Sequence, residues 1–449
     1  MQLKVKPVLI VGDTWHVFPQ PDCQLHVTTD IETSRSEVET LFGQLGEKVG
    51  GNAVFLEPAL IDNEQDLVKL KKDILEADAF LVYLSGGMAN ESFQKLWELE
   101  IPIIAFSGDC TPMMGLYALP VEEREFHPNV TFALDYREIE DQLRLVGVIK
   151  RLRNTKMVLL GTHQREAYFW QHIPDPVIAR RKLGVEFIPV SCTEFLAEAA
   201  RVEPAEAETI AEEWTSKAKE MVEPSPAEVE EAAKLYVAMY NILKEKTAQA
   251  ISVGCLELMY AYGKAPLCFP LAILRDKGFP AGCEADASAT LTMILMEYLA
   301  DRPAYMGNFV QADPDKNIVM ISHGCSPSKM SGRDQPAKPY TLVHSHSYPP
   351  FTRVLEGGAG LTSYVAYDKG QEVTIARIGA NLDRMVATRG KIVDCWDSIC
   401  DRTTISIQVN DARRFFHNAT GNHQVVVYGD YLADLRELCR LLDIKLVEA

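Results

Sequence analysis

Short apolar runs alternate with longer amphipathic segments over the first two thirds of the chain. The apolar runs have the length of strands, and segments such as 34–49, 65–77 and 136–154 have the length of helices. The runs lie at residues 7–11, 53–56, 79–84, 101–106, 156–161, 185–190 and 251–256. Strands that alternate with helices in this way are typical of parallel βαβ units. The pattern predicts two α/β domains, at residues 1–154 and 155–335.

The pattern changes after residue 336, where apolar runs follow one another without helices between them. These runs lie at residues 340–344, 360–367, 372–378, 385–393, 403–408 and 424–428. One amphipathic segment at 432–442 closes the chain. Such a series of strands indicates a small antiparallel sheet or barrel. The predicted fold is therefore α/β, with two parallel-sheet domains followed by a β-rich antiparallel C-terminal domain at 336–449.

Composition and charge narrow the possible partners. The chain has 449 residues, 47% of them hydrophobic, and a formal net charge of −18. Such a charge repels phosphate backbones and anionic lipid, so we expect no nucleic-acid partner. No apolar run approaches the ~20 residues of a spanning helix, and the opening run lacks a small-residue cleavage site behind it. Ten cysteines without CxxC zinc spacing favour a reducing compartment, so we expect a cytoplasmic protein with no membrane partner.

Polar loops follow several predicted strands of the first domain. In open α/β sheets, ligands bind beyond the carboxyl ends of the strands. The loops are Gly12-Asp-Thr-Trp-His16, Ser85-Gly-Gly87 and Ser107-Gly-Asp-Cys-Thr-Pro112. Their residues are also ordinary for turns and helix caps, although together they outline a crevice. Because Ser85-Gly-Gly87 lacks the spacing of a dinucleotide-binding loop and the chain has no P-loop, we predict no nucleotide cofactor.

Two carboxylates and a histidine mark the second domain as the place for a metal. Glu284 and Asp286 end a predicted strand just before a helix, and alternation points them the same way if the strand continues. Two neighbouring carboxylates repel unless a cation or a proton lies between them. His323 ends the strand at 317–322, which we place in the same sheet, and mixed carboxylate and imidazole ligands suit Mn²⁺, Fe²⁺, Co²⁺ or Zn²⁺. The alternative is that Asp286 only caps the helix, Glu284 is solvated and His323 is structural.

Further histidines lie near the C-terminus. His423 stands in Gly421-Asn-His423, directly before an apolar strand. His344 and His346 follow the first strand of the C-terminal domain. The roles of ligand, acid–base group and packing residue all stay open for these side chains.

Three of these segments resemble the L-fucose isomerase and L-arabinose isomerase superfamily. They are Gly282-Cys-Glu-Ala-Asp286 with its following helix, Asp313-Pro-Asp through Ile321-Ser-His323-Gly, and Gly421-Asn-His423 before a Val-rich strand. The resemblance covers most of the chain and is clearest from residue 251 onward. It implies an aldose–ketose isomerase of carbohydrate metabolism with a bound divalent cation, usually Mn²⁺. It also implies a homo-oligomer, trimer or hexamer.

The resemblance also implies roles for individual residues. Glu284 and His323 look like metal ligands, His423 like a further ligand or substrate contact, and Asp286 matches the second acidic position. The chain departs from the arabinose enzymes at Met306-Gly-Asn308, where those enzymes carry a second catalytic glutamate. Asp286, a histidine or Glu257 could replace it, although Glu257 is also typical of a solvated helix start. Substrate-binding roles are assigned to Trp15, His16, Asp109, Cys110, His344 and His346, the first four by completing a neighbouring subunit's site.

The chemistry needs few groups. Moving a carbonyl between two carbons of a sugar requires a cation to stabilise the enediolate and a carboxylate to carry the proton. The alternatives are a sugar-binding protein that is not an enzyme and a metal-dependent ketose aldolase or lyase. The sugar is fucose, arabinose, another deoxy sugar or a sulfonated hexose. Four arginines could hold an anionic group or are surface residues, namely Arg165, Arg353, Arg413 and Arg414.

Overall fold

The protein is described by a computed structural model. It describes residues 2–11, 53–61, 64–85, 91–106, 127–161, 172–345, 359–398 and 401–449, together with residues 36, 40 and 42–44. The chain divides into two compact units. The first holds residues 1–151 with 440–442, and the second holds residues 152–439 with 443–449.

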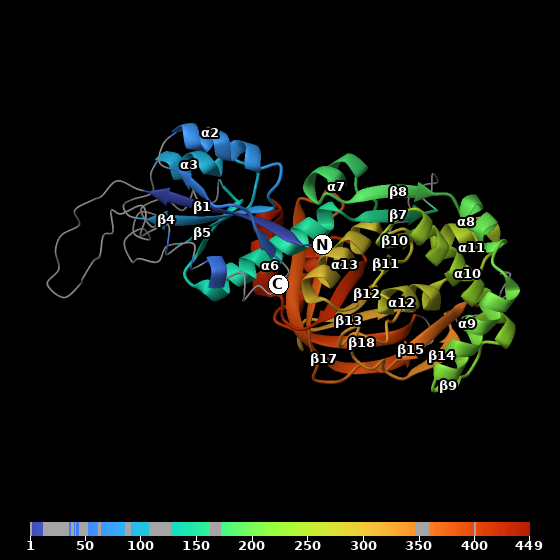
Figure 1. The fold of residues 1–449 in the computed structure, drawn as a ribbon. Helices are drawn as coiled ribbons and strands as arrows, with labels where there is room; N and C mark the ends of the chain where they lie inside the picture. Colours follow the sequence, from blue (N-terminus) through green and yellow to red (C-terminus); the bar gives the residue numbers. More distant parts are fainter. Residues whose placement is uncertain are drawn as a thin grey trace. The chain divides into compact units, whose positions relative to one another are not determined.

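The first unit is a parallel sheet covered by helices on both faces (Figure 1). Its strands run in the order β2-β1-β4-β5-β6, and β3 pairs with β1. Phe80 and Val82 of β4 pack against α2 and α3, whereas Leu81 and Tyr83 pack against α6, as expected from side-chain alternation along a strand. The elements are β1 (Leu3–Val11), β2 (Ala53–Phe55), β3 (Ala59–Ile61), α2 (Glu64–Asp73), β4 (Ala79–Ser85), α3 (Glu91–Trp97), β5 (Ile103–Phe106), β6 (Val130–Ala133) and α6 (Tyr136–Arg153).

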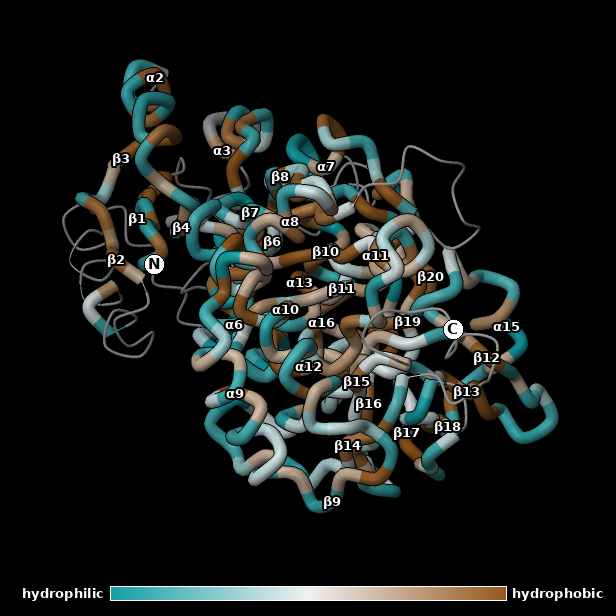
Figure 2. The backbone as a smooth tube through the Cα atoms, turned by 90° about the vertical axis from the view of Figure 1, so that its right-hand side faces the viewer, coloured by the Kyte–Doolittle hydropathy of each residue, from teal (hydrophilic) through white to brown (hydrophobic). Residues whose placement is uncertain are grey.

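The second unit begins with another parallel sheet, in the order β11-β10-β7-β8. Its strands are β7 (Lys156–Leu160), β8 (Glu186–Val190), β10 (Ala250–Val253) and β11 (Ala281–Gly282). Its helices are α7 (Pro176–Lys182), α8 (Cys192–Ala199), α9 (Pro204–Lys217), α10 (Pro226–Glu245), α11 (Cys255–Tyr262), α12 (Cys268–Asp276) and α13 (Ala287–Ala300). Figure 2 shows α9 largely in hydrophilic colours and β10 in hydrophobic ones, consistent with a buried sheet and an exposed helix. Within the described chain, no helix combines the length and apolarity needed to cross a membrane.

The second unit also contains a closed antiparallel barrel. The strands follow the order β16-β19-β12-β13-β18-β17, and β16 pairs back onto β17. They are β12 (Tyr305–Asp313), β13 (Ile318–His323), β16 (Glu372–Ile378), β17 (Arg384–Ser398), β18 (Arg402–Val409) and β19 (His423–Tyr428). β20 (Lys445–Glu448) adds to β17, and β9 (Glu220–Met221), β14 (Tyr340–His344) and β15 (Leu361–Val365) form a separate small sheet. The helices α15 (Ala412–Asn418) and α16 (Leu432–Leu441) complete this region.

This architecture confirms the predicted fold class of two parallel-sheet α/β parts followed by an antiparallel β-rich part. One strand was placed wrongly. We expected residues 317–322 to lie in the same parallel sheet as the strand before Glu284, whereas β13 belongs to the barrel and pairs with β12 and β18. A short apolar strand can belong to a parallel sheet or to an antiparallel barrel, so the sequence of β13 alone does not tell which of the two it joins.

Helix α13 joins the parallel sheet to the barrel. It packs against β10 and β11 on one side and against β16 and β19 on the other, and it is apolar around most of its circumference. Ser288 Oγ donates to the Ile378 carbonyl (2.6 Å), and the Ile378 amide donates to Thr292 Oγ1 (3.0 Å). A Cβ at Gly282 would lie 1.9 Å from Thr290 Oγ1, so only glycine allows β11 to approach α13 this closely. These contacts hold the first turn of α13 at one end of the barrel.

Candidate metal centre

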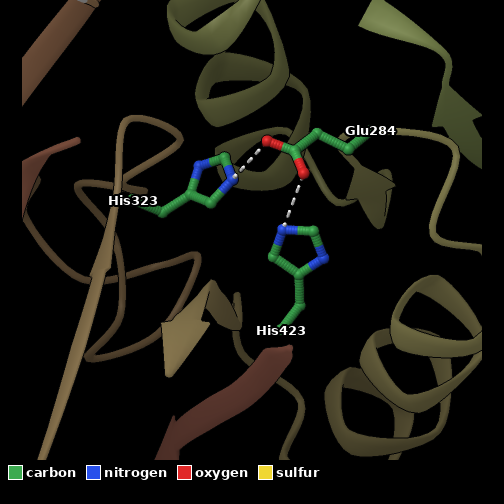
Figure 3. A group of neighbouring side chains, drawn as sticks. All are labelled: Glu284, His323 and His423. Atoms are coloured by element: carbon green, nitrogen blue, oxygen red, sulfur yellow. Dashed lines mark ion pairs between the residues drawn. The ribbon is translucent and has the colours of Figure 1, made fainter. Parts of the chain in front are cut away.

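Three side chains from separate elements of the second unit converge. Glu284 lies in the turn between β11 and α13, His323 ends β13, and His423 begins β19. One ligand atom of each residue lies within 4.8 Å of the ligand atoms of the other two. Figure 3 shows both imidazole rings directed at the Glu284 carboxylate. Nε2 of His423 is 3.3 Å from Oε2, and Nε2 of His323 is 4.0 Å from Oε1.

The turn that carries Glu284 has an unusual backbone. β11 ends at Gly282, so the alternation considered for a continuing strand does not apply. Glu284 and Ala285 adopt φ angles of 57° and 53°, in the left-handed region that residues other than glycine seldom occupy. The Ala285 amide donates to the Val253 carbonyl (2.8 Å), which ties the turn to β10. Backbone strain of this kind persists where the surrounding structure enforces it, and it is concentrated at functional sites.

The barrel brings the two histidines together. β12 lies between β19 and β13, and its residue Asn308 is opposite His423 on one side and Ser322 on the other. His323 follows Ser322 and is the last residue of β13, next to a bulge in the pairing with β18. Both imidazoles therefore lie at the same end of the barrel, which is the end that the first turn of α13 covers.

Asp286 contacts His423 and helps to fix its orientation. Its Oδ1 accepts a hydrogen bond from the Ala289 amide (2.9 Å), so it caps α13 as one alternative predicted. Its Oδ2 is 2.9 Å from His423 Nδ1, and the Arg377 guanidinium contacts both oxygens at 2.9 and 3.0 Å. A carboxylate against Nδ1 keeps the proton on that nitrogen and leaves Nε2 free to bind an ion.

The charges of this network set the protonation of its members. Burial raises the pKa of Asp286, but Arg377 and His423 outweigh burial and hold this pKa at about 2. Burial lowers the pKa of His423, but Glu284 and Asp286 outweigh it and raise this pKa to about 9. Burial also opposes ionisation of Glu284, yet His423 keeps the pKa of Glu284 below its usual value. For His323, burial dominates and lowers the pKa.

The three converging residues fit a divalent cation. The Nε2 atoms of His323 and His423 are both buried, and neither has a hydrogen-bond partner among the described residues. A buried polar atom without a partner is costly, and a metal ion is one way to satisfy it. One carboxylate and two imidazoles are a donor set for transition-metal ions rather than for Mg²⁺. The residues present are thus consistent with a divalent cation.

The structure does not bring every predicted residue to this point. Glu257 lies in the first turn of α11, where its carboxylate is close to Cys192 and Gly161. The ring of His344 is 3.1 Å from the Glu228 carboxylate and lies outside the three-residue group. Arg413 and Arg414 are exposed on α15. The other predicted substrate and anion residues lie outside the described residues, namely Trp15, His16, Asp109, Cys110, Arg165, His346 and Arg353.

Three further residues near the centre escaped the sequence analysis. Arg377 is fully buried, and a lone arginine inside the apolar strand 372–378 was a usable signal. The backbone carbonyl of His172 accepts a hydrogen bond from the Ser288 amide (2.9 Å). Burial and the charge of Arg377 lower the pKa of the His172 imidazole, and the Asp286 carboxylate opposes them. Asp401 accepts a hydrogen bond from Asn308 and directly precedes Arg402, which is opposite His323 in the pairing of β13 with β18. No local pattern marks His172 or Asp401.

Comparisons with known proteins point to one kind of enzyme. No protein-family model matches the chain. A sulfoquinovose isomerase of Alkalicoccus urumqiensis is 22% identical over 415 residues, which is 87% of this chain and 90% of that protein. Sulfoquinovose isomerases of Clostridium sp. (strain MSTE9) and Priestia megaterium are each 24% identical, over 73% and 68% of this chain and 70% and 66% of their own lengths.

These relatives indicate an isomerase, that is, an intramolecular oxidoreductase. They support a place for the chain among sugar isomerases, at a distant level of similarity. The match to the Alkalicoccus urumqiensis protein leaves little of either chain unaligned.

Proposed function

We propose that this protein is a divalent-cation-dependent aldose–ketose isomerase that acts on a sulfonated hexose. One observation carries the proposal: Glu284, His323 and His423 converge, with no hydrogen-bond partner for either Nε2 atom among the described residues, in a chain that aligns over 87% of its length with a sulfoquinovose isomerase. Sulfoquinovose is therefore the first substrate to test. Fucose-type and arabinose-type sugars are the neutral alternatives.

The three converging residues would hold the ion. A bound divalent cation supplies Lewis acidity, which stabilises negative charge on neighbouring sugar oxygens. Asp286 holds the Nδ1 proton of His423, and Arg377 keeps Asp286 ionised by binding both of its oxygens. The burial of both imidazoles excludes competing water from their Nε2 atoms. Arg377 thus sets the protonation state of Asp286, and Asp286 in turn sets the protonation state and position of His423.

Isomerisation also requires a group that carries a proton between adjacent carbons. A carboxylate suits this task because it can take the proton and return it to the neighbouring carbon. Such a group must reach the sugar while the ion is held. The reaction creates no other bond, so an isomer of identical mass is the only product that this function allows.

Several finer proposals accompany this function. We propose Mn²⁺ as the ion, a cytoplasmic location, and a homo-oligomer, trimer or hexamer. In such an assembly, N-terminal loops of a neighbouring subunit would complete the substrate site. The residues proposed for this contact are Trp15, His16, Asp109 and Cys110.

The test is an isomerase assay on chelated and re-metallated protein. The purified protein is stripped with a chelator, supplied with Mn²⁺, Co²⁺, Zn²⁺ or Mg²⁺, and incubated with sulfoquinovose and with neutral aldoses. We expect conversion of sulfoquinovose to a ketose of the same mass, lost on chelation and restored by Mn²⁺. Shorter products would indicate an aldolase or lyase, and binding without conversion would indicate a sugar-binding protein; either result would overturn the proposal.

A matched pair of variants connects the activity to the site. Glu284→Gln removes the carboxylate charge among the three converging residues. Glu203→Gln makes the same change at the exposed start of α9, where the side chain forms no capping hydrogen bond. We expect the first variant to lose both ion binding and turnover, and the second to keep both. Full turnover in Glu284→Gln would remove this residue from the site.

A further inference from the structure

The proposed isomerase lacks an evident proton carrier, and this inference rests on that proposed function. Glu284 is occupied as a candidate ligand of the ion. Asp286 is fully buried and its two oxygens are held by Arg377, His423 and the Ala289 amide. Glu257 lies beside Cys192, outside the three-residue group. Glu284 and Asp286 are thus already engaged with other groups, which leaves the proton transfer on the sugar to a different carboxylate.

Asp401 lies at the same end of the barrel as the two histidines. It directly precedes β18, and its backbone carbonyl accepts a hydrogen bond from Ser322 Oγ (3.4 Å), next to His323. Asn308 Nδ2 donates to Asp401 Oδ2 (3.1 Å). Asn308 is opposite His423 in the pairing of β12 with β19, so the Asp401 carboxylate is held by a direct neighbour of His423.

The pairing of β13 with β18 supports this placement. Arg402, the residue after Asp401, is opposite His323 in that pairing, next to a bulge. Asp401 itself lies outside the group whose ligand atoms lie within 4.8 Å of one another.

The structure holds Asp401 in a fixed position. Asp401 and Arg402 have φ angles of 58° and 33°, a strained conformation for residues other than glycine. Arg402 is anchored by two hydrogen bonds of 2.7 Å to Asp397 and by bonds of 2.8 and 3.1 Å to Glu223. With the next residue fixed in this way, the position of Asp401 is determined by the fold rather than by a free loop.

Asn308 is fixed as well. Its Oδ1 accepts a hydrogen bond from Asn422 Nδ2 (2.6 Å), which leaves its Nδ2 directed at Asp401. Asp401 itself is half-buried, and among the described residues no hydrogen-bond donor is assigned to its Oδ1. One carboxylate oxygen is held while the other is available, which is the arrangement that a proton carrier needs.

We propose that Asp401 is the acid–base catalyst of the isomerisation and that Asn308 positions it. The Asp401 carboxylate takes the proton from C2 of the aldose; the C2–H electron pair forms a C1–C2 double bond, and the carbonyl electrons move to O1. The proton on O2 passes to O1, the carbonyl forms at C2, and Asp401 returns its proton to C1. No oxidant, reductant or other reactant is consumed.

The first test replaces Asp401→Asn and compares it with Asp315→Asn, which makes the same change in the exposed β12–β13 turn. General acid–base catalysis contributes roughly 10²–10⁴-fold, so we expect kcat of Asp401→Asn to fall by that factor. The stoichiometry of bound Mn²⁺ and the Kd of the ketose product should stay within about threefold of the unaltered protein. Incorporation of deuterium from D₂O at C1 should fall with kcat, and Asp315→Asn should match the unaltered protein in every readout.

A second test moves the carboxylate. Asn308→Asp combined with Asp401→Asn exchanges the two side chains of the hydrogen bond, so a carboxylate remains at the site about one side chain away. We expect this double variant to recover at least tenfold of the kcat lost in Asp401→Asn. Asn308→Ala, which removes only the positioning amide, should lower kcat by roughly tenfold with a smaller change in KM.

The outcomes separate this inference from the proposed function. If the unaltered protein isomerises no sugar, the proposed function fails and with it the inference. If the unaltered protein is active and Asp401→Asn keeps more than a tenth of its kcat, only the inference fails. Loss of bound Mn²⁺ in Asp401→Asn would also overturn it, because Asp401 would then be a ligand rather than a proton carrier.

Discussion

Replacing Arg377 with methionine should destabilise the second unit strongly. Arg377 and Asp286 are both 0% exposed, and the guanidinium contacts both carboxylate oxygens. Methionine fills a similar volume but leaves the Asp286 charge buried without this partner. Breaking a buried ion pair from one side costs about 3–5 kcal/mol, and since His423 and the Ala289 amide still contact Asp286 we expect about 3 kcal/mol here.

The assay is urea unfolding of the chelated protein, with Arg389→Met as the matched control. Arg389 pairs with Asp430 at 3.4 Å on the surface of the same barrel, with the two side chains 60% and 42% exposed. An exposed pair contributes roughly 0–1 kcal/mol, so the control should unfold near the unaltered protein. If Arg377→Met loses no more free energy of unfolding than Arg389→Met, the ion pair does not support the site as described.

The same variant should change the acid response. The pKa of Asp286 in the folded protein is about 2, below its ordinary value of 3.8. A depressed carboxylate pKa contributes stability that is complete above about pH 4 and is lost as the pH falls toward 2. At 1.36 kcal/mol per unit of pKa, this contribution is about 2 kcal/mol. We expect the stability of Arg377→Met to change less between pH 4 and pH 2 than that of the unaltered protein.

Three further predictions concern the centre and its support. The pKa of His423 is about 9 in the ion-free protein, so at pH 7 Mn²⁺ must displace a proton from this residue when it binds. Calorimetry in buffers of different ionisation enthalpy should therefore show about one proton released at pH 7, and release of no proton would contradict the assignment of His423 as a ligand. Asp286→Asn should weaken Mn²⁺ binding by about 10–100-fold in a competition titration with a chelating dye, because it removes the carboxylate behind His423; an unchanged Kd would refute that role. Gly282→Ala should lower the melting temperature, because the new Cβ would lie 1.9 Å from Thr290 Oγ1. The control Gly147→Ala in α6 meets nothing within 4 Å and should not lower the melting temperature, so equal effects of the two variants would refute the packing argument.

Much of the fold followed from periodicity. The strand at 79–84 and the helix at 136–154 were readable because apolar residues recur at strand or helix spacing, and the structure has β4 and α6 there. The position of β13 did not follow, because sheet membership depends on long-range pairing that a six-residue apolar run does not encode. Closure of the barrel by β16 and β17 is equally a tertiary property.

Some residues of the candidate site could likewise be predicted from the sequence, and others could not. Glu284 and His323 were recognisable because each directly follows or ends an apolar strand within a motif. The left-handed turn at Glu284 was not, since neither Glu284 nor Ala285 is a residue type that favours positive φ. Asp401 contacts Asn308 only because β18 pairs with β13 on one side and with β17 on the other. No local sequence pattern predicts that contact.

The order of the three converging residues along the chain has a consequence for biosynthesis. Glu284 precedes the barrel, and His423 begins the last barrel strand to be synthesised. A ribosome therefore exposes the carboxylate and the first imidazole well before the second imidazole exists. Under the proposed assignment, a nascent or truncated chain cannot acquire its full set of donors, so capture of the ion becomes a late event that reports completed folding of the barrel.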